Sequence, residues 1–260
     1  MKLKLTIEYA GTRYSGWQIQ KNARTVQGAL TQAIAEVTGR RDFELYGSGR
    51  TDAGVHALAQ VAHLDLDSTT PPETLRRRIN DVLPSDIVIL RAEKVRHRFH
   101  ARHDALARSY LYQVSRRRTA FGKPFVWWVK EELDVARMRE ATPGFVGFHD
   151  FQAFSDDDPS EKSTDVQLDT LDVYEDEDLI LIHVEGSHFL WKMVRRLVGV
   201  LVEVGRGGMA PEAAAALLSS PSGLPARLTA PASGLFLERV YYDGDRRDVP
   251  IRSVVTIARL

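Results

Sequence analysis

The stretch with the clearest chemical potential is a glycine-rich loop at residues 47–56, which has the sequence GSGRTDAGVH. It holds one carboxylate, Asp52, two residues from one cation, Arg50, with three glycines around them. Glycine lets the backbone turn sharply and lets a substrate approach closely. A carboxylate held on such a loop could serve as a nucleophile or as a general base. The competing interpretation is that Asp52 only forms a turn by bonding nearby backbone amides.

The segments around this loop predict strands and helices in mixed order. Alternating Leu3, Leu5, Ile7 and Tyr9 predict an opening strand, and Thr25 and Gly39 are suited to cap the two ends of a helix. Further strands are expected near 43–46, 59–66, 87–95, 106–115, 168–174, 179–185 and 235–242, and further helices near 72–83, 135–141, 193–204 and 211–218.

The order of these elements does not repeat as a strand–helix–strand array, so an α+β fold is predicted, with a mostly antiparallel central sheet flanked by helices. We expect an N-terminal half at residues 1–104 that carries the Asp52 loop and a similar C-terminal half at 105–245. The charged tail at 246–260 is expected to be peripheral.

Composition excludes several classes of chemistry. The 260 residues include no cysteine, which removes disulfides, cysteine-bound zinc, iron–sulfur clusters and thiol nucleophiles. The start alternates like a strand instead of forming an apolar signal segment, and the longest apolar run, near 197–202, is far too short to span a membrane. A cytoplasmic protein is expected.

Charge is balanced overall but segregated along the chain. There are 35 basic and 35 acidic residues, yet residues 91–118 hold nine Lys or Arg against two acids, whereas residues 156–178 hold eleven acids against one Lys. Two solvated faces are the simpler interpretation. Alternatively, a polyanion would respond to the local field, and the stretches at 76–78, 96–102 and 116–118 are then candidates for phosphate contacts.

Two clusters could suggest a metal site. His97, His100 and His103 are spaced by three, but arginines lie between them and would repel a cation. The acidic run at 156–158 is followed by Pro159 and Ser160, so a solvated, flexible loop is the simpler account. No metal and no cofactor are expected.

The Asp52 loop resembles the catalytic motif of the TruA-type tRNA pseudouridine synthases, through GRTDAGVHA at 49–57. Further segments match this family in the same order and cover nearly the whole chain to about Tyr242: YAGTRYSGWQ at 9–18 with TVQ at 25–27, FHAR at 99–102 with RSYLY at 108–112, FL at 189–190 with MVR at 193–195, and APASGL at 230–235. Ala10, Arg196 and Ala232 stand where the family usually has Asp, Asn and Pro, which affects contacts to RNA more than the chemistry.

The resemblance implies a pseudouridine synthase fold and the isomerisation of uridines at positions 38–40 of the tRNA anticodon stem-loop, by a homodimer. It makes Asp52 the essential carboxylate, as nucleophile or base, with Arg195 as its ion-pair partner and Tyr110 as the ring that stacks on the uracil. Arg50 is the candidate for holding the extruded nucleotide. The substrate-binding residues that it implies are Tyr110, Arg50, Thr51, His56, Arg102 and Arg108.

Two rival functions remain. A non-catalytic RNA-binding factor could keep the same fold, although the presence of Asp52, Tyr110 and Arg195 argues against it. A phosphotransferase with an aspartate nucleophile would need a second acid and magnesium nearby, and the glycine-rich loop offers neither.

Overall fold

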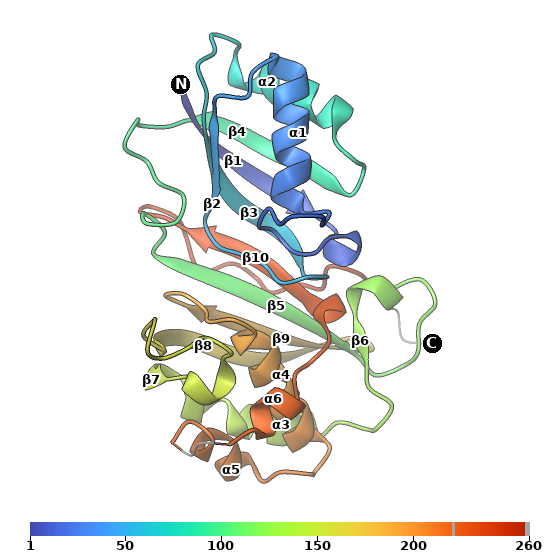
Figure 1. Ribbon diagram of the computed structural model, residues 1–260. Helices are drawn as coiled ribbons and strands as arrows, with labels where there is room; N and C mark the ends of the chain where they lie inside the picture. The colour runs from blue at the N-terminus through green and yellow to red at the C-terminus, as the bar shows by residue number, and fades with distance from the viewer. Residues whose placement is uncertain (220–221, 258–260) are drawn as a thin grey trace. The chain divides into compact units, whose positions relative to one another are not determined.

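The computed structural model of the chain describes residues 1–219 and 222–257. It contains two compact units. Unit 1 is Met1–Leu106 together with Phe236–Arg246, and unit 2 is Ala107–Leu235 together with the segment that begins at Arg247. Each unit consists of β-strands with helices packed against them (Figure 1).

The sheet of unit 1 is built around its first strand. It contains β1 (Lys2–Tyr9), β2 (Glu44–Gly47), β3 (His56–Asp65), β4 (Ile87–Lys94) and β10 (Leu235–Tyr241), which belongs to the unit from Phe236 onward. The strand order is β4-β1-β3-β10, and β2 pairs with β3. β10 joins β3 in parallel, whereas β1, β2 and β4 pair antiparallel with their neighbours.

One face of this sheet forms the core of unit 1. Leu3, Leu5 and Ile7 of β1 are buried, as are Leu30 and Ile34 of α1 (Val26–Thr38). The Thr25 hydroxyl accepts a hydrogen bond from the Gly28 amide, and Gly39 ends the helix at φ +69°. α1 runs along the strands, and α2 (Pro72–Val82) packs on α1 and β4 (Figure 1).

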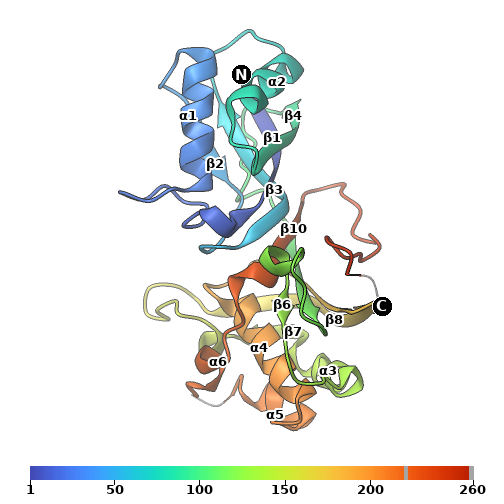
Figure 2. The same ribbon diagram turned by 90° about the vertical axis from the view of Figure 1, so that its right-hand side faces the viewer.

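Unit 2 has its own strands and most of the helices. Its strands are β5 (Ala107–Ser115), β6 (Trp127–Trp128), β7 (Gly147–Asp150), β8 (Asp165–Asp176) and β9 (Leu179–Gly186), in the order β5-β9-β8-β7 with β6 parallel to β5. Its helices are α3 (Val135–Ala141), α4 (Met193–Gly205), α5 (Pro211–Ala216) and α6 (Leu224–Arg227). The helices gather together in Figure 2, with α4 in contact with the other three.

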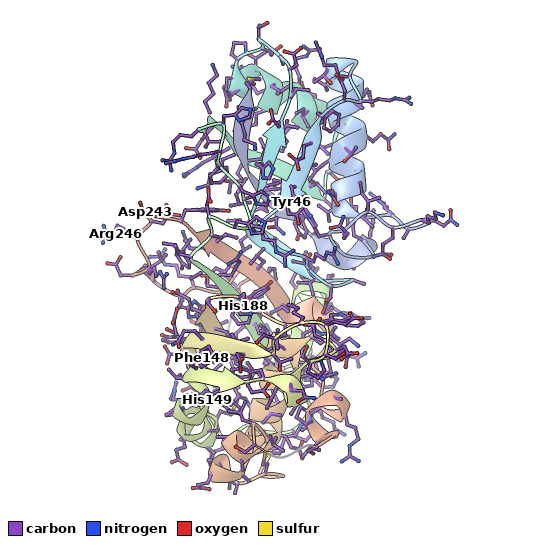
Figure 3. The ribbon with its side chains drawn as sticks, turned by 60° about the vertical axis from the view of Figure 1, so that its left-hand side comes forward. Tyr46, Phe148, His149, His188, Asp243 and Arg246 are labelled. Atoms are coloured by element: carbon purple, nitrogen blue, oxygen red, sulfur yellow. The ribbon has the colours of Figure 1, made fainter. Side chains whose placement is uncertain are left out.

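The remaining regular elements are short. Turns of 3-10 helix lie at Gly11–Arg13, Lys123–Phe125, Pro143–Phe145, Gln152–Phe154 and Ala232–Gly234. At the end of the sheet of unit 2, the edge strand β7 carries Phe148 and His149 (Figure 3). In the described ranges, none of the helices combines the length and the apolar character that a bilayer crossing would need.

The α+β class and the mostly antiparallel pairing are confirmed, because within the described parts of the two units only β10 with β3 and β6 with β5 are parallel. The expected helices and strands are present with shifts of a few residues at their ends. The sequence did not predict β6, β7 or α6, which have two to four residues each and are too short for a periodic pattern.

The segment at 247–257, expected to be peripheral, is half-buried or exposed except at Ile257, which joins the core of unit 2. Ile257 is buried in a cluster with Leu111, Val126, Leu179 and Leu181. The Val254 amide donates to Gln113, and Arg247 pairs with Glu185 and Asp169. The cluster that receives Ile257 exists only once unit 2 has folded, whereas Val254 of the same segment is exposed.

Candidate active site

The Asp52 loop leaves β2 and returns into β3 through a hydrogen-bonded turn. The Val55 amide donates to the main-chain oxygen of Asp52 at 3.1 Å, and Gly54 takes φ +80° in the third position of this turn. A positive φ at that position is the signature of a turn that favours glycine. Asp52 is half-buried, Arg50 is exposed and Thr51 is buried. The turn therefore presents the carboxylate beside a buried neighbour that fixes the backbone.

Side chains of the adjacent strands hold this backbone in place. The hydroxyls of Tyr9 and Thr51 lie 2.8 Å apart, and Gln60 bonds both the Ser48 hydroxyl and the Gly49 carbonyl. Burial raises the pKa of Tyr9 to about 12, so its hydroxyl keeps its proton at neutral pH. The carboxylate is thus mounted on a rigid loop, a condition that favours catalysis by a positioned group.

The loop at 10–17 braces the Asp52 loop from the other side. The Trp17 amide donates to the Thr51 carbonyl at 3.1 Å, and the Gly54 amide donates to the Tyr14 carbonyl at 3.2 Å. A methyl group added at Gly16 would lie 2.5 Å from the Thr51 carbonyl oxygen. The loop at 10–17 and the Asp52 loop approach so closely that position 16 requires glycine. The loop at 10–17 thereby supports the backbone of the Asp52 loop.

His56 is a bracing residue in this arrangement. Its side chain is buried, its Nδ1 accepts a hydrogen bond from the Gly11 amide at 3.0 Å, and its ring stacks on Phe236 with centroids 4.8 Å apart. An Nδ1 atom that accepts must be unprotonated, so the neutral ring carries its proton on Nε2. The substrate-binding role implied for His56 remains a prediction.

In unit 2, the closing segment at 230–234 holds Arg195 and Tyr112. The Arg195 Nε donates to the Ala230 carbonyl at 2.7 Å, and the Ala230 amide donates to the Arg195 carbonyl at 3.0 Å. The Tyr112 hydroxyl donates to the Pro231 carbonyl at 2.8 Å. Burial raises the pKa of Tyr112 well above its ordinary value, and the positive charge of Arg195 opposes this shift. The Ala230 carbonyl therefore orients the guanidinium of Arg195.

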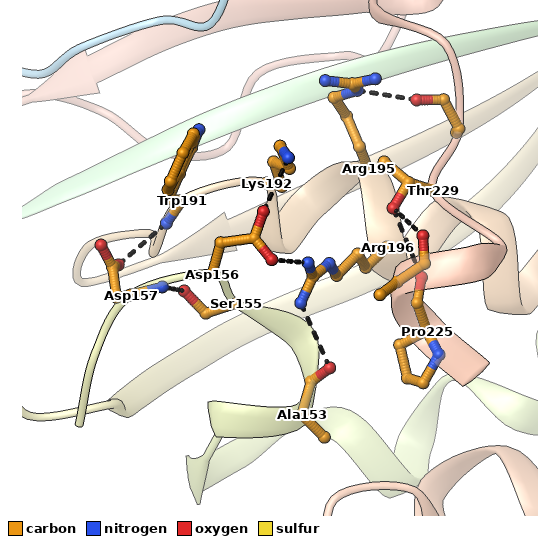
Figure 4. A network of polar contacts seen from close by, with 12 residues as sticks. Ala153, Ser155, Asp156, Asp157, Trp191, Lys192, Arg195, Arg196, Pro225 and Thr229 are labelled. Carbon is orange, nitrogen blue, oxygen red and sulfur yellow. Dashed lines mark hydrogen bonds and ion pairs between the residues drawn. The ribbon is translucent and has the colours of Figure 1, made fainter. Parts of the chain in front are cut away.

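The start of α4, which carries Arg195, is tied down by acidic residues (Figure 4). Asp156 pairs with Lys192 at 2.6 Å and with the buried Arg196. Lys192 precedes the helix in the left-handed conformation at φ +63°. The hydrogen bond from Lys192, with that from Arg196, holds the pKa of Asp156 below its ordinary value. We call Asp156, Lys192 and Arg196 the α4 clamp.

Asp156 and Asp158 are exposed, as expected of a solvated loop at 156–158, and the α4 clamp adds ion pairs from Asp156 to the start of α4 that were not expected. Asp157 also accepts a hydrogen bond from the Trp191 amide at 3.0 Å (Figure 4). The Asp158 carboxylate accepts its hydrogen bonds from Ser160, two residues further along the same loop. Arg196, which departs from the residue usual in the resembling family, is one of the partners of Asp156. An ion pair that links residues 40 positions apart leaves no local signal in the sequence.

The other residues implied to bind the substrate also belong either to unit 1 or to unit 2. Tyr110 on β5 is half-buried, and its ring meets Phe189 edge-on with centroids 5.0 Å apart. Arg108 donates to the Ser187 carbonyl at 2.8 Å. Arg102 is exposed in the loop after β4. Unit 1 thus brings together Arg50, Thr51, Asp52 and His56, and unit 2 holds Arg108, Tyr110 and Arg195.

The arginine stretches at 76–78 and 116–118 have acidic or backbone partners within the protein. Arg116 pairs with Glu175, and Arg117 pairs with Asp178 at 2.9 Å. Arg76 pairs with Glu73 at 2.7 Å, and Arg78 donates to the Val37 carbonyl. The segregation of charge along the chain is therefore partly cancelled in space, because the acidic β8–β9 hairpin lies beside the basic end of β5.

No group of three or more His, Cys, Asp or Glu side chains among residues 1–219 and 222–257 is arranged to hold a metal ion. The bracing residues Tyr9, Trp17 and Gln60 and the carboxylate Asp156 were not predicted as parts of the site. Tyr9 and Trp17 lie in a matched motif, which is the one signal that could have drawn attention to them. Gln60 and Asp156 have no such signal.

Comparison with known proteins accounts for nearly the whole chain. The family described as "tRNA pseudouridine synthase" matches residues 5–104 and 141–243. "tRNA pseudouridine synthase A 2" of Clostridium tetani is 40% identical over 245 residues, which is 93% of this chain and 98% of the relative. "tRNA pseudouridine synthase A" of Ruminiclostridium cellulolyticum is 41% identical over 93% of this chain and 99% of the relative.

"tRNA pseudouridine synthase A" of Rhodopseudomonas palustris is 43% identical over 93% of this chain and 99% of the relative. Among solved structures, the "Crystal Structure of a Cbf5-Nop10-Gar1 Complex" has a TM-score of 0.29 and 11% identity, covering 76% of this chain and 54% of that chain, a likeness too slight to inform on function. The match to the family and the identity to its members over almost their full length show that this chain belongs to the tRNA pseudouridine synthase family.

Proposed function

We propose that this protein converts uridines at positions 38–40 of the tRNA anticodon stem-loop to pseudouridine, with Asp52 as the essential carboxylate. Family membership supports the reaction. The braced Asp52 loop is the observation that supports the residue, because backbone hydrogen bonds and the Tyr9–Thr51 contact fix it on both sides.

The reaction rearranges bonds without redox change. The bond between uracil N1 and ribose C1′ breaks, the uracil turns, and C1′ bonds to C5. The C5 proton leaves and N1 gains a proton, so the substrate and product have the same composition. A single carboxylate can begin this sequence, either by attacking as a nucleophile or by removing a proton. Both roles need the ionised form of Asp52.

The other residues are proposed to support Asp52. Arg195 favours the ionised carboxylate through its positive charge. Tyr110 stacks on the uracil, since a planar ring next to a base contributes about 1–3 kcal/mol. Arg50 holds the nucleotide outside its stem, because extrusion costs about a few kcal/mol that the protein must offset. Thr51, His56, Arg102 and Arg108 complete the contacts to the substrate.

The decisive experiment uses transfer RNA labelled with tritium at uridine C5. Release of tritium should fall at least about 10³-fold in Asp52→Asn and Asp52→Ala, while the Kd for RNA stays within a few-fold. Asp42→Asn is the matched control, because Asp42 is highly exposed and pairs only loosely with Arg40 at 3.6 Å. Full release in Asp52→Ala would exclude the assignment.

Substrate site and assembly need separate measurements. Carbodiimide labelling and primer extension on the product RNA should place the new pseudouridines at positions 38–40. Sedimentation at working concentration should give the mass of a homodimer, and cell fractionation should recover the protein in the cytoplasm. Modification restricted to another stem would leave the reaction in place and remove the proposed anticodon specificity.

A further inference from the structure

The loop that follows β4 carries exposed arginines and rests on a buried histidine. Ala101, in the middle of this loop, has no exposed surface. Its amide donates to Nδ1 of His63 at 3.1 Å, and its carbonyl accepts from the Tyr242 hydroxyl at 2.6 Å. Both backbone groups of one residue are thus held by side chains from distant parts of unit 1.

His63 belongs to the face of the sheet that is opposite the apolar core. It lies on β3 with Lys4 of β1 and Tyr46 of β2 directly across from it, whereas its neighbours Ala62 and Leu64 point the other way. Tyr46, labelled in Figure 3, stacks with the His63 ring at a centroid distance of 5.8 Å. The loop at 96–104 therefore covers a polar face of the sheet with a neutral or charged imidazole beneath it.

His100 repeats the same kind of contact within the loop. Its Nδ1 accepts from the amides of Arg102 at 3.2 Å and His103 at 3.3 Å. Its ring lies 4.7 Å from that of His63 and 4.2 Å from that of His103, measured between centroids. Three successive amides, from Ala101 to His103, thus donate to two imidazole nitrogens, and a protonated Nδ1 cannot accept any of them.

We propose that His63 and His100 form an imidazole clasp that positions the basic loop at 96–104 for RNA, and that protonation of the clasp releases the loop. Neutral imidazoles fix the backbone from which Arg102 projects, with Arg96 and Arg98 exposed on the same loop. The proposal rests on the proposed function in that the ligand is tRNA. It adds two positioning residues and a pH dependence of binding.

The surroundings of the clasp favour its neutral form. Burial lowers the pKa of both histidines, and the positive charge of Lys2 lowers that of His63 further against the opposing charge of Glu44. The charged and titratable groups that face the two rings are Lys2 and Lys4 on β1, Glu44 and Tyr46 on β2, Tyr242 after β10, and His103 and Asp104 in the loop.

The sign of the effect follows from the lowered pKa. The released loop has histidines of ordinary pKa, about 6.5, and binds protons more readily than the clasped loop. The clasp is therefore fully stable above about pH 6.5 and weakens as the pH falls through the lower pKa of the folded protein. One pH unit below that value, about one molecule in ten keeps a neutral His63, so the Kd for RNA rises about tenfold.

This direction is opposite to that of simple electrostatics. Protonating histidines adds positive charge and should tighten binding to a polyanion. Weaker binding on acidification therefore distinguishes the clasp from a general charge effect. His97 supplies the internal control, because it lies in the same loop, is almost fully exposed, and has only a distant contact with Asp65 at 3.9 Å.

The experiment measures two quantities from pH 7.5 to 5.0 at constant ionic strength. The first is the Kd for an anticodon stem-loop RNA, and the second is hydrogen exchange of residues 96–104 without RNA, corrected for the intrinsic rate. The wild type and His97→Gln should bind more weakly and exchange faster on acidification. His63→Asn, whose side-chain oxygen can accept but does not titrate, should lose His63's part of this dependence, and His63→Asn with His100→Asn should lose it entirely.

Tyr242→Phe keeps the ring and removes the hydroxyl that donates to the Ala101 carbonyl. It should raise the pH at which exchange accelerates, and it tests the clasp even if the histidine variants do not fold. Tighter binding of the wild type at low pH, or an unchanged pH dependence in the double histidine variant, would overturn the proposal. If hydrogen exchange shows the clasp as proposed but the protein releases no tritium from labelled tRNA, the proposed function alone would be refuted.

Discussion

Replacing Gly16 by alanine should damage catalysis through the backbone of the Asp52 loop. Gly16 has φ +89°, and an added Cβ would lie 2.5 Å from the Thr51 carbonyl oxygen and 3.2 Å from the Asp52 carbonyl carbon. Ordinary contact begins at 3.4 Å, so the two segments must separate by about 0.9 Å at this point. The Trp17 amide already bonds the same carbonyl at 3.1 Å, which leaves little room for adjustment.

Two energetic terms determine how far Gly16→Ala lowers the free energy of unfolding. Left-handed backbone costs a residue with a side chain about 1 kcal/mol, and overpacking costs about 1–3 kcal/mol, which together lower the free energy of unfolding by about 2–4 kcal/mol. A displacement of nearly 1 Å at a catalytic group can reduce the rate by about 10²-fold. We therefore expect kcat for tritium release to fall about 10- to 100-fold in protein that is still folded.

Gly39→Ala is the matched control for this variant. Gly39 has φ +69° at the end of α1, and nothing lies within 4 Å of an added Cβ, so only the backbone term applies. Urea unfolding should show a loss of about 1 kcal/mol, with unchanged kcat. Single-turnover tritium release at saturating enzyme should compare the two variants under conditions where circular dichroism shows both folded. Equal kcat in Gly16→Ala and Gly39→Ala would refute the reasoning.

Three further predictions concern unit 2. Asp156→Ala leaves the buried Arg196 without its carboxylate and should lower the free energy of unfolding, measured in urea, by about 2–3 kcal/mol. Asp158→Ala loses only the exposed hydrogen bonds to Ser160 and should lower it by much less. Equal losses in the two variants would contradict the α4 clamp. The pKa of Asp156 in the folded protein is below its ordinary 3.8. The stability that ionised Asp156 contributes is therefore present above pH 3.8 and is lost as the pH falls through the lower folded pKa. Acid unfolding of Asp156→Asn should lack this loss, and identical acid titrations of the variant and the wild type would contradict the prediction. Tyr112→Phe removes the hydrogen bond to the Pro231 carbonyl and should lower the free energy of unfolding in urea by about 1 kcal/mol. An unchanged free energy of unfolding would contradict this prediction.

The elements that the sequence predicted well are those fixed by neighbours along the chain. The ends of α1 follow from Thr25 and Gly39, whose effects act within one helical turn. β1 follows from the alternation of Leu3, Leu5 and Ile7. The Asp52 turn follows from its glycines, because residues 52–55 close it with a hydrogen bond between themselves.

The parts of the site that the sequence missed depend on residues far apart in the chain. Asp156 and Arg196 are 40 residues apart, and Tyr242 reaches Ala101 across 141 residues. β10 joins β3 in parallel through Phe236 and His56, a pairing that no local pattern specifies. Each of these contacts depends on distances that are set only when the chain has folded and its distant segments have come together.

The sequence by itself therefore determined the local elements, the α+β class and the carboxylate loop on which the proposed chemistry depends. Tertiary structure alone decided what holds that loop and Arg195 in place, which acids neutralise which arginines, and that a buried imidazole supports the basic loop at 96–104. The physical reason is that turns and periodic faces are set by a few consecutive residues. Hydrogen bonds and ion pairs between side chains are instead set by where strands from opposite ends of the chain meet.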